Sequence, residues 1–392
     1  MTRARSWRAR ARTAANRSAE YSLPLPAGAI LALIWANTFP AAYTVFAHRL
    51  EFAINDIGMM FFFALATKEV VEATVPGGAL HTWRRAAMPV VAAIGGMIGP
   101  ALIYLTIVHL SGQPALGRGW AIPCATDIAF SYLIARAIYG HHPAVPFLVL
   151  LAIADDAFGL GILAVFYPAG DLRPAAGVTL LLAAVCVSWV LRRRGVRSFW
   201  PYVLAGGALS WSAFFLGGLH PALALVPVIP FLPHAARDPG LYTPAPASAR
   251  DALSEFEHWW THPVQAILFL FGVVNAGVPL HALGVGTWAV LSGVLVGKPV
   301  GIAAGIAVAT LGGLRLPAGV VWKDVIVVAF AAAIGFTVAL FFATAAFPAG
   351  PVLDQVKMGA LLSVCGAIIA LAVAALLRAG RFTVSLARRP SR

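Results

Sequence analysis

Two adjacent aspartates, Asp155 and Asp156, lie in the apolar run LLAIADDAFGLGILAVF, which covers residues 150–166. No other charged residue occurs between Pro143 and Gly170. A carboxylate at the centre of a membrane-embedded helix costs roughly 2.5–3.5 kcal/mol, so such residues usually have a function. Two neighbouring carboxylates in a poorly solvated site resist ionising together. The pair should therefore hold a proton near neutral pH unless a cation replaces it.

The cation that could replace this proton is a hard one. Sodium or lithium, once stripped of water, prefers oxygen ligands such as carboxylates. Consecutive residues on a helix point about 100° apart, so Asp155 and Asp156 can flank a cavity but cannot both face one partner. Competition between a proton and a cation for one acidic site is sufficient to build an exchanger. We therefore predict that sodium or lithium binds at this aspartate pair.

The segment GWAIPCATDIAF, residues 119–130, predicts a helix that breaks near its middle. Pro123 removes an amide hydrogen and clashes with the preceding turn. Thr126 and Asp127 then lie in or beside unwound backbone, which is tolerated at membrane depth only where it lines a cavity or is buried in protein. Such a break exposes a positive N-terminus, which Asp127 can balance, and a negative C-terminus, which Lys298 can balance.

A purely structural interpretation of these charges is also open. Asp127 could simply cap a half-helix, and Lys298 could be a structural counter-ion for one aspartate. Four ionisable side chains within predicted spans nevertheless favour a functional site over four separate structural roles.

The elements that must position these residues are membrane-spanning helices. Of the 392 residues, 60% are hydrophobic and only 11% are charged, about half the charged fraction of a soluble domain. Apolar runs long enough to cross a bilayer recur between short loops. We predict an all-α membrane protein with twelve helices, at roughly 27–47, 55–74, 87–110, 120–138, 146–167, 174–191, 202–218, 219–232, 262–279, 286–311, 323–346 and 353–377.

A second break is predicted in helix eleven, at AAIGFTVALFF, where Gly335, Phe336 and Thr337 interrupt the run. Broken helices near the middle of the membrane are typical of transporters. In helix ten, glycine recurs every fourth residue from Gly293 to Gly305, which would let a neighbouring backbone approach closely.

The net charge of +13 follows the predicted topology. With both termini in the cytoplasm, most Lys and Arg residues fall on the cytoplasmic side, as the positive-inside rule requires. The basic excess therefore indicates orientation and attraction to anionic membrane lipid, not nucleic-acid binding. We predict basic cytoplasmic tails at 1–23 and 380–392 around a transport domain at 24–379, with a linker between two bundles at about 234–261. Residues 1–23 lack the apolar core of a signal peptide.

Seven motifs occur in the order that they have in a known family of transporters. They are NDIGMMFFF from Asn55, GWAIPCATDIAF from Gly119, AIADDAFG from Ala152, GLHPALAL from Gly218, VVNAGV from Val273, VGKPVGI from Val296 and IGFTVALFFATAAF from Ile334. Together they resemble the NhaA sodium/proton antiporters, a family built on inverted repeats.

This resemblance implies a twelve-helix fold with inverted repeats and two interrupted, crossing helices, four and eleven. Asp155 and Asp156 match the ion- and proton-binding pair, Thr126 and Asp127 the broken-helix residues, and Lys298 the buried lysine that can pair with Asp155. It also implies a bacterial inner-membrane protein that exchanges one cytoplasmic sodium or lithium for two external protons. Transport would then be electrogenic, activated at alkaline pH and carried out by a homodimer.

The family's response to pH is tied to a cytoplasmic funnel. Glu69, Glu257 and His258 would lie there, and His220 is also implicated. In the place of the usual GLEVKRE, the chain has ALATKEVVEA, so Glu69 matches while the following basic pair is lost. EHWWTHP, with Glu257 and His258, has one residue more than the usual run. His220 and His258 could equally be ordinary interfacial histidines.

Another departure concerns the dimer. Only HRLEFAI separates helix one from NDIGMM, where the family usually has a longer loop that forms a dimerising hairpin.

We therefore predict an electrogenic sodium or lithium antiporter that contributes to sodium and pH homeostasis. The alternative is a sodium-coupled symporter for an organic solute on a similar scaffold, which would need a more polar cavity. A relative that keeps the fold as a sensor without transport is a further alternative, although it would have no reason to retain buried charge. An enzyme is not expected, because the sequence has no nucleophile–base set, metal-ligand spacing or cofactor motif.

Overall fold

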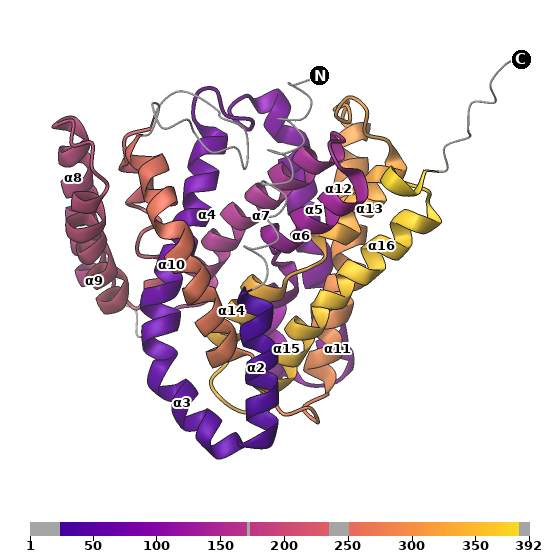
Figure 1. The fold of residues 1–392 in the computed structure, drawn as a ribbon, viewed down its shortest axis with the longest axis horizontal. Coiled ribbons are helices and arrows are strands. Elements are labelled where there is room, and N and C mark those ends of the chain that lie inside the picture. The colour runs from indigo at the N-terminus through magenta and orange to yellow at the C-terminus, as the bar shows by residue number, and fades with distance from the viewer. Residues whose placement is uncertain (1–23, 171–172, 235–250, 384–392) are drawn as a thin grey trace, which may run out of the picture.

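The computed structural model describes residues 24–170, 173–234 and 251–383, and every element in these ranges is helical (Figure 1). The predicted all-helical class is therefore confirmed for this part of the chain. The predictions for 1–23, for most of the linker and for 384–392 fall outside the described residues.

The helices of the first half are α2 (Pro24–Thr38), α3 (Pro40–Phe52), α4 (Met59–Thr74), α5 (Trp83–Leu110), α6 (Ile128–Tyr139), α7 (Ala144–Phe166), α8 (Pro174–Arg193) and α9 (Ala208–Gly217). Those of the second half are α10 (Ala252–Asn275), α11 (Val285–Ser292), α12 (Lys298–Leu311), α13 (Trp322–Ala332), α14 (Phe336–Ala346), α15 (Pro351–Leu362) and α16 (Gly366–Leu376). Short 3₁₀ or π segments (η) continue several of them.

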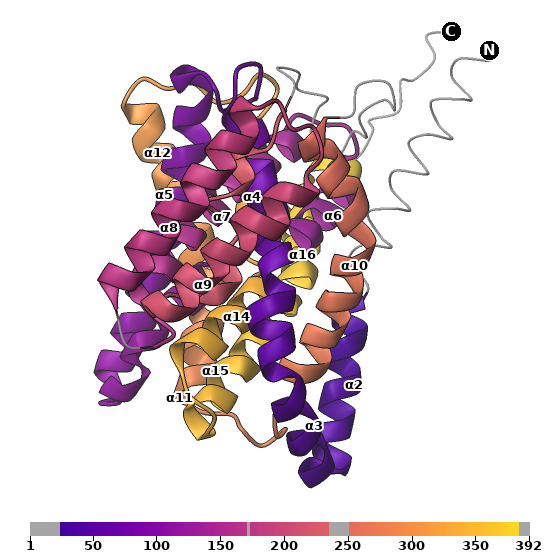
Figure 2. The same cartoon turned by 90° about the vertical axis from the view of Figure 1, so that its left-hand side faces the viewer.

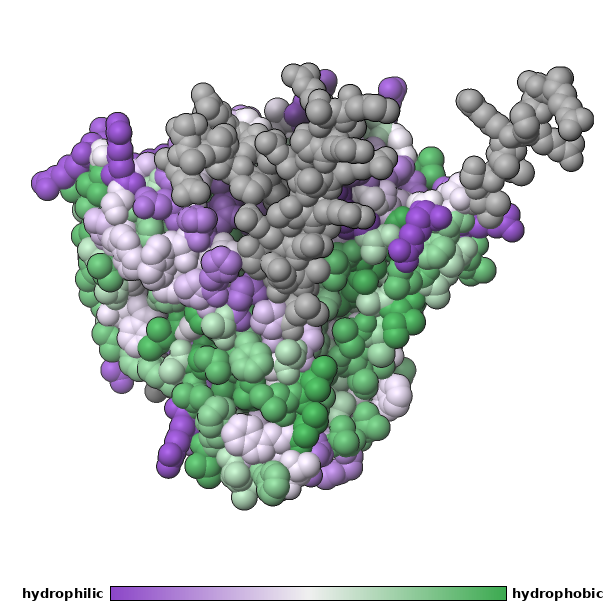
Figure 3. Space-filling view, viewed as in Figure 1, coloured by the Kyte–Doolittle hydropathy of each residue, from purple (hydrophilic) through white to green (hydrophobic). Residues whose placement is uncertain are grey.

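The helices are those of a membrane protein. Within the described ranges, six helical stretches are long and apolar enough to cross a bilayer, and eight are if each of two bent pairs counts as one span. Two shorter apolar helices, Pro24–Thr38 and Tyr202–Gly217, accompany them. Apolar side chains cover the middle of the face in Figure 3, and hydrophilic ones gather towards its upper edge. The count of twelve spans stays a prediction.

The predicted loop HRLEFAI is wrong, because residues 48–54 are helical. Pro40–Thr74 forms one helical stretch of 35 residues, made of α3, the π segment η1 (Ala53–Gly58) and α4. The chain turns earlier, at Phe39, whose backbone is not helical (φ −134°, ψ 65°). The residue before a proline avoids helical geometry, whereas proline suits the first turn of the next helix. The dip in hydropathy at 48–54 therefore marks no break in the helix.

The predicted helix at 219–232 is also wrong. This segment forms only two 3₁₀ turns, η4 (Pro221–Leu223) and η5 (Ile229–Phe231), although most of it is buried. Its sequence, LHPALALVPVIPFL, places three prolines within ten residues. Each proline removes a backbone donor and clashes with the preceding turn, so an α-helix cannot form here despite the apolar composition.

The two predicted breaks are confirmed. The 3₁₀ helix η2 (Pro114–Cys124) and α6 are bent by 49° across the break at 125–127. Helices α13 and α14 are bent by 48° across the break at 333–335. The last part of the predicted linker is helical, because α10 runs without interruption from Ala252 to Asn275.

The predicted glycine stripe packs against α5. Gly297 and Gly301 face Gly95 and Gly99, and a Cβ at Gly297 would lie 2.6 Å from the Cα of Pro100. Both views of the fold show α5 and α12 beside each other (Figures 1 and 2). This close backbone contact fixes the start of α12, where Lys298 lies, against the interior of the molecule.

Candidate ion-binding site

The two interrupted helices meet at their breaks. The amide of Asp127 donates a hydrogen bond of 2.6 Å to the carbonyl oxygen of Ile334. The hydroxyl of Thr126 also lies 3.3 Å from the carbonyl oxygen of Ala332. Unwound backbone carries unpaired donors and acceptors, and here each break supplies partners for the other.

The Asp127 carboxylate lies between the N-termini of two half-helices. Its Oδ1 accepts a hydrogen bond of 3.2 Å from the amide of Phe130, which caps α6. Its Oδ2 accepts hydrogen bonds from the amide and the hydroxyl of Thr337, in the first turn of α14. Because helix N-termini carry partial positive charge, one buried carboxylate balances both of them. The cap predicted from the sequence and the charge-balancing role thus belong to the same residue.

Lys298 lies at the opposite end of the first break. Its side chain is fully buried, and its ammonium donates 2.9 Å to Oδ2 of Asp155. The same ammonium donates to the carbonyl oxygen of Cys124, the last residue of η2. The lysine therefore faces the negative end of a half-helix and a carboxylate together, so the structural and charge-balancing interpretations again describe one set of contacts.

The two central aspartates differ in their partners. Oδ2 of Asp155 accepts from Lys298 and, at 2.6 Å, from the hydroxyl of Thr126. Its Oδ1 is buried and has no hydrogen-bond partner within the described residues. Asp156 is half-buried and makes no hydrogen bond or ion pair with any described residue. A buried acceptor normally has a partner, so the unpaired Oδ1 of Asp155 indicates a place where a proton or a cation could bind. The unpaired carboxylate of Asp156 offers a second such place.

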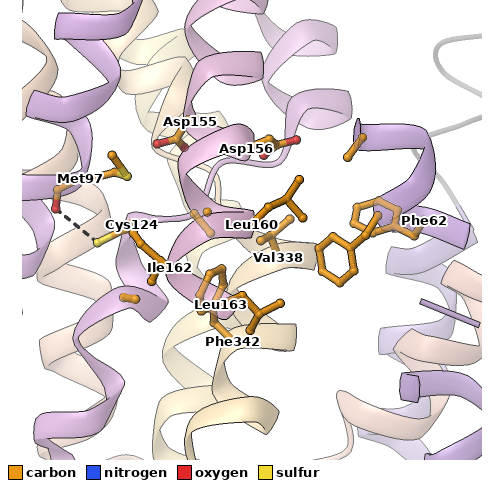
Figure 4. Close-up of a pocket in the computed structure, with 15 residues that line it drawn as sticks. Phe62, Met97, Cys124, Asp155, Asp156, Leu160, Ile162, Leu163, Val338 and Phe342 are labelled. Carbon is orange, nitrogen blue, oxygen red and sulfur yellow. Dashed lines mark hydrogen bonds between the residues drawn. The ribbon is translucent and has the colours of Figure 1, made fainter. Parts of the chain in front are cut away.

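A small cavity adjoins both aspartates (Figure 4). The cavity has a volume of about 20 Å³, which is enough for about one water molecule. Figure 4 shows the two carboxylates pointing to different sides of α7 above this cavity. Apart from them, the wall is made of apolar side chains and sulfur-containing ones, such as Leu160, Val338 and Cys124. Among the described residues, no three His, Cys, Asp or Glu side chains are placed to hold a metal ion together.

Comparison with known proteins gives the family. Residues 13–376 match the family model described as Na+/H+ antiporter 1. The chain belongs to the NhaA family of Na+/H+ antiporters. It is 44% identical over 365 residues to the Na(+)/H(+) antiporter NhaA of Desulfitobacterium hafniense, covering 90% of this chain and 93% of that protein. It is 45% identical over 369 residues to the NhaA of Geobacter metallireducens, covering 91% and 95%.

A solved structure agrees at the level of the fold. The sodium proton antiporter MjNhaP1 of Methanocaldococcus jannaschii matches with a TM-score of 0.59 and 16% sequence identity, over 94% of this chain and 96% of that one. Membership of the NhaA family makes the chain a sodium/proton antiporter of a membrane, with these ions as its substrates, and not an enzyme.

Two of the residues predicted for the pH response of NhaA proteins are brought together by a lysine. The ammonium of Lys68 on α4 lies 3.4 Å from Glu69 and 2.6 Å from Glu72. It also lies 2.8 Å from Glu257 on α10 and thereby links the two helices. Sequence reasoning left Lys68 and Glu72 without a role. Their signal was visible, because the spacing of four residues between them puts opposite charges on one helix face.

The two predicted histidines do not join this cluster. His258 is exposed, and His220 is buried 3.9 Å from Asp56 and against the ring of Phe341. Asp56 lies thirteen residues before Glu69 on the same helical stretch, which is about 20 Å.

A buried pair of amides near Asp56 was also missed. Asn55 and Asn275 exchange hydrogen bonds of 2.8 and 3.1 Å. Both residues lie in motifs of the NhaA resemblance, and two asparagines in apolar runs were the available signal.

Proposed function

We propose that this chain exports sodium, or lithium, from the cytoplasm in exchange for external protons, and that Asp155 and Asp156 hold both kinds of ion in turn. Two protons enter for each cation that leaves, so the exchange is electrogenic and contributes to sodium and pH homeostasis. The protein lies in the inner membrane of a bacterium with both termini in the cytoplasm.

The observation that carries this proposal is the set of carboxylate oxygens without partners beside a cavity of about 20 Å³. Carboxylate oxygens are ligands for a dehydrated hard cation and are equally acceptors for a proton. Apart from the two carboxylates and the thiol of Cys124, the wall of this cavity has no polar side chain that could bind an organic solute. This favours the antiporter over the sodium-coupled solute symporter, which would need a larger and more polar cavity.

The contacts of Asp155 indicate how cation and proton exclude each other. Its Oδ2 is held by Lys298 and Thr126, while Oδ1 is free. A cation bound at Oδ1 brings a second positive charge close to the Lys298 ammonium, which disfavours the proton on this lysine. One entering cation can therefore displace one proton from the Lys298 ammonium, and its charge also favours loss of one proton from Asp156 across the cavity, which gives two protons for one cation.

The broken helices support alternating access. Their interruptions keep polar backbone at the site while Asp127 and Lys298 balance the exposed helix ends. Crossing helices, inverted repeats and twelve spans make up the rest of the proposed architecture, in which two bundles rock around the fixed site. Homodimerisation is part of the same proposal.

We further propose that the Lys68 cluster mediates the response to pH on the cytoplasmic side. Glu69, Glu72 and Glu257 surround one lysine. Protonation of Glu257 weakens the ionic contact between α4 and α10, and protonation of Glu69 or Glu72 weakens the contacts that the lysine makes within α4. His220 and Asp56 form a separate titratable pair in this scheme.

The test uses purified protein in proteoliposomes that contain a fluorescent pH probe. Sodium or lithium added at alkaline pH releases protons in the wild type, and Asp156→Asn abolishes this release. Asp324→Asn is the matched control, because Asp324 is buried outside the cavity and caps α13 by accepting from the amide of Val321, a contact that asparagine preserves. Full exchange by Asp156→Asn would remove the aspartate pair from the mechanism.

The electrogenic character is tested on the same vesicles with a potential-sensitive dye. Sodium flux should generate a membrane potential, and an electroneutral exchange would leave the dye signal unchanged. Sodium-driven uptake of a labelled organic solute would instead support the symporter.

A further inference from the structure

Two of the residues that line the cavity beside the aspartates contain sulfur. Met97 on α5 and Cys124 at the end of η2 both line it, and Figure 4 shows their sulfur atoms on the Asp155 side. Carboxylates suit hard cations, whereas thiolates and thioethers select soft ones. The cavity thus offers two kinds of ligand to a small cation, and sodium transport uses only one of them.

Cys124 is part of the cavity wall, and Figure 4 shows its sulfur directed towards the backbone of Met97. Its thiol lies 3.3 Å from the carbonyl oxygen of Met97 and 3.5 Å from that of Trp120. The residue is only 4% exposed and is one of those that line the cavity.

A second observation indicates that the same cavity attracts a cation. Oδ1 of Asp155 is buried without a hydrogen-bond partner, and Asp156 next to it has no ionic partner among the described residues. These oxygens stabilise any monovalent cation that enters, hard or soft. The polarisable sulfur atoms then bind a soft cation more tightly than a hard one.

We propose that this cavity is a binding site for a soft monovalent metal cation, of which silver(I) is the representative, held between the sulfur atoms of Cys124 and Met97. Silver(I) carries the charge of sodium and is close to it in size, but it prefers sulfur. On binding, the S–H bond of Cys124 breaks and an S–Ag bond forms, while the proton passes to a carboxylate of the cavity. No electron is transferred. The bound metal occupies the place of sodium and blocks exchange.

The other two cysteines serve as controls. Cys186 and Cys365 are exposed and do not line the cavity. Their replacement in a Cys186→Ser/Cys365→Ser variant leaves Cys124 as the single thiol of the chain.

The first experiment measures exchange in proteoliposomes in chloride-free nitrate buffer with added silver nitrate. Silver should inhibit both the wild type and the Cys186→Ser/Cys365→Ser variant, and excess dithiothreitol should reverse this. A tenfold rise in sodium should raise the silver concentration for half-inhibition about tenfold, a result that rests on the proposed function. Cys124→Ala should need at least tenfold more silver, and Met97→Leu an intermediate concentration. Equal sensitivity of Cys124→Ala and the wild type would overturn the proposal.

The second experiment needs no transport. Silver bound per purified protein is counted by mass spectrometry after desalting, in the Cys186→Ser/Cys365→Ser variant with and without Cys124→Ala. We expect one tightly bound silver ion that is lost with Cys124, and binding that persists without Cys124 would overturn the site. If silver binds Cys124 but sodium neither protects it nor releases protons in the untreated protein, the proposed antiport function fails while the soft-metal site stands.

Discussion

Removing either charge of the Lys298–Asp155 pair should destabilise the protein strongly, and removing both should cost much less than the sum of the two losses. The pair is 2.9 Å long, and the side chains are 0% and 3% exposed. Truncating one partner of a buried ion pair costs about 3–5 kcal/mol because the other charge is left uncompensated, whereas replacing both is often nearly neutral. We therefore expect losses of about 3 kcal/mol or more for Lys298→Met and for Asp155→Asn separately.

The double variant Lys298→Met/Asp155→Asn should lose much less than the sum of the two. Its asparagine still accepts the hydrogen bond of Thr126, and its methionine fills most of the lysine's volume. The coupling energy should then be about 2–3 kcal/mol, at the upper end of the values for residues in contact, so the double variant should lose about 3–4 kcal/mol where additive losses would total about 6 kcal/mol.

The assay is equilibrium unfolding in mixed micelles with increasing dodecyl sulfate, followed by circular dichroism at a pH of about 8 without sodium. Lys357→Met is the matched control, because Lys357 is half-buried but makes no ion pair among the described residues. It should change the free energy of unfolding by about 1 kcal/mol or less. Additive losses in the double variant would refute the assignment of an interacting pair.

Three further pairs of substitutions test the surrounding structure by the same unfolding measurement. Asp127→Ala removes a cap worth about 0.5–2 kcal/mol and a charge worth about 0.3–1 kcal/mol at each of two helix N-termini. Asp127→Asn should keep most of the cap. Equal losses of stability in the two variants would contradict the capping role. Gly301→Val forces a side chain against the backbone of Gly95 and Gly99 and should cost about 1–3 kcal/mol, while Gly161→Ala, with open space around it, should cost nothing. Glu257→Gln should lower the free energy of unfolding by less than about 1 kcal/mol, because the Glu257 side chain is 44% exposed and Glu72 remains 2.6 Å from Lys68. Lys68→Met should lower it by more, because three carboxylates are then left without their cation.

The site was predictable because its chemistry conflicts with its surroundings. Charges in apolar runs at Asp127, Asp155 and Lys298 stand out against lipid, and Pro123 indicates where the helix must unwind. The contacts that join these residues were not predictable, because they depend on how the two breaks meet. That one carboxylate, Asp127, would cap two half-helices at once follows from three-dimensional packing and not from any local pattern.

The errors in the fold share a physical cause. Hydropathy reports where a chain can be buried, and it does not report whether its backbone can be helical. The apolar segment 219–232 is buried but contains too many prolines for an α-helix, whereas the polar segment 48–54 is helical in spite of its charges. Glu257 was expected near Glu69. The pairing of Lys68 with Glu72 was visible in their spacing of four residues, but the contact of Lys68 with Glu257 depends on how α4 and α10 pack.

The decisive measurement is the number of protons displaced when sodium binds to the purified protein. Sodium is titrated into weakly buffered protein at alkaline pH, with binding heat followed by calorimetry and released protons by a pH indicator. If the cation and the proton share one pair of carboxylates, the release of protons should saturate together with the binding heat. It should approach two protons per sodium in the wild type and vanish in Asp156→Asn. Binding heat without any proton release from the wild type would show that the two ions occupy separate sites.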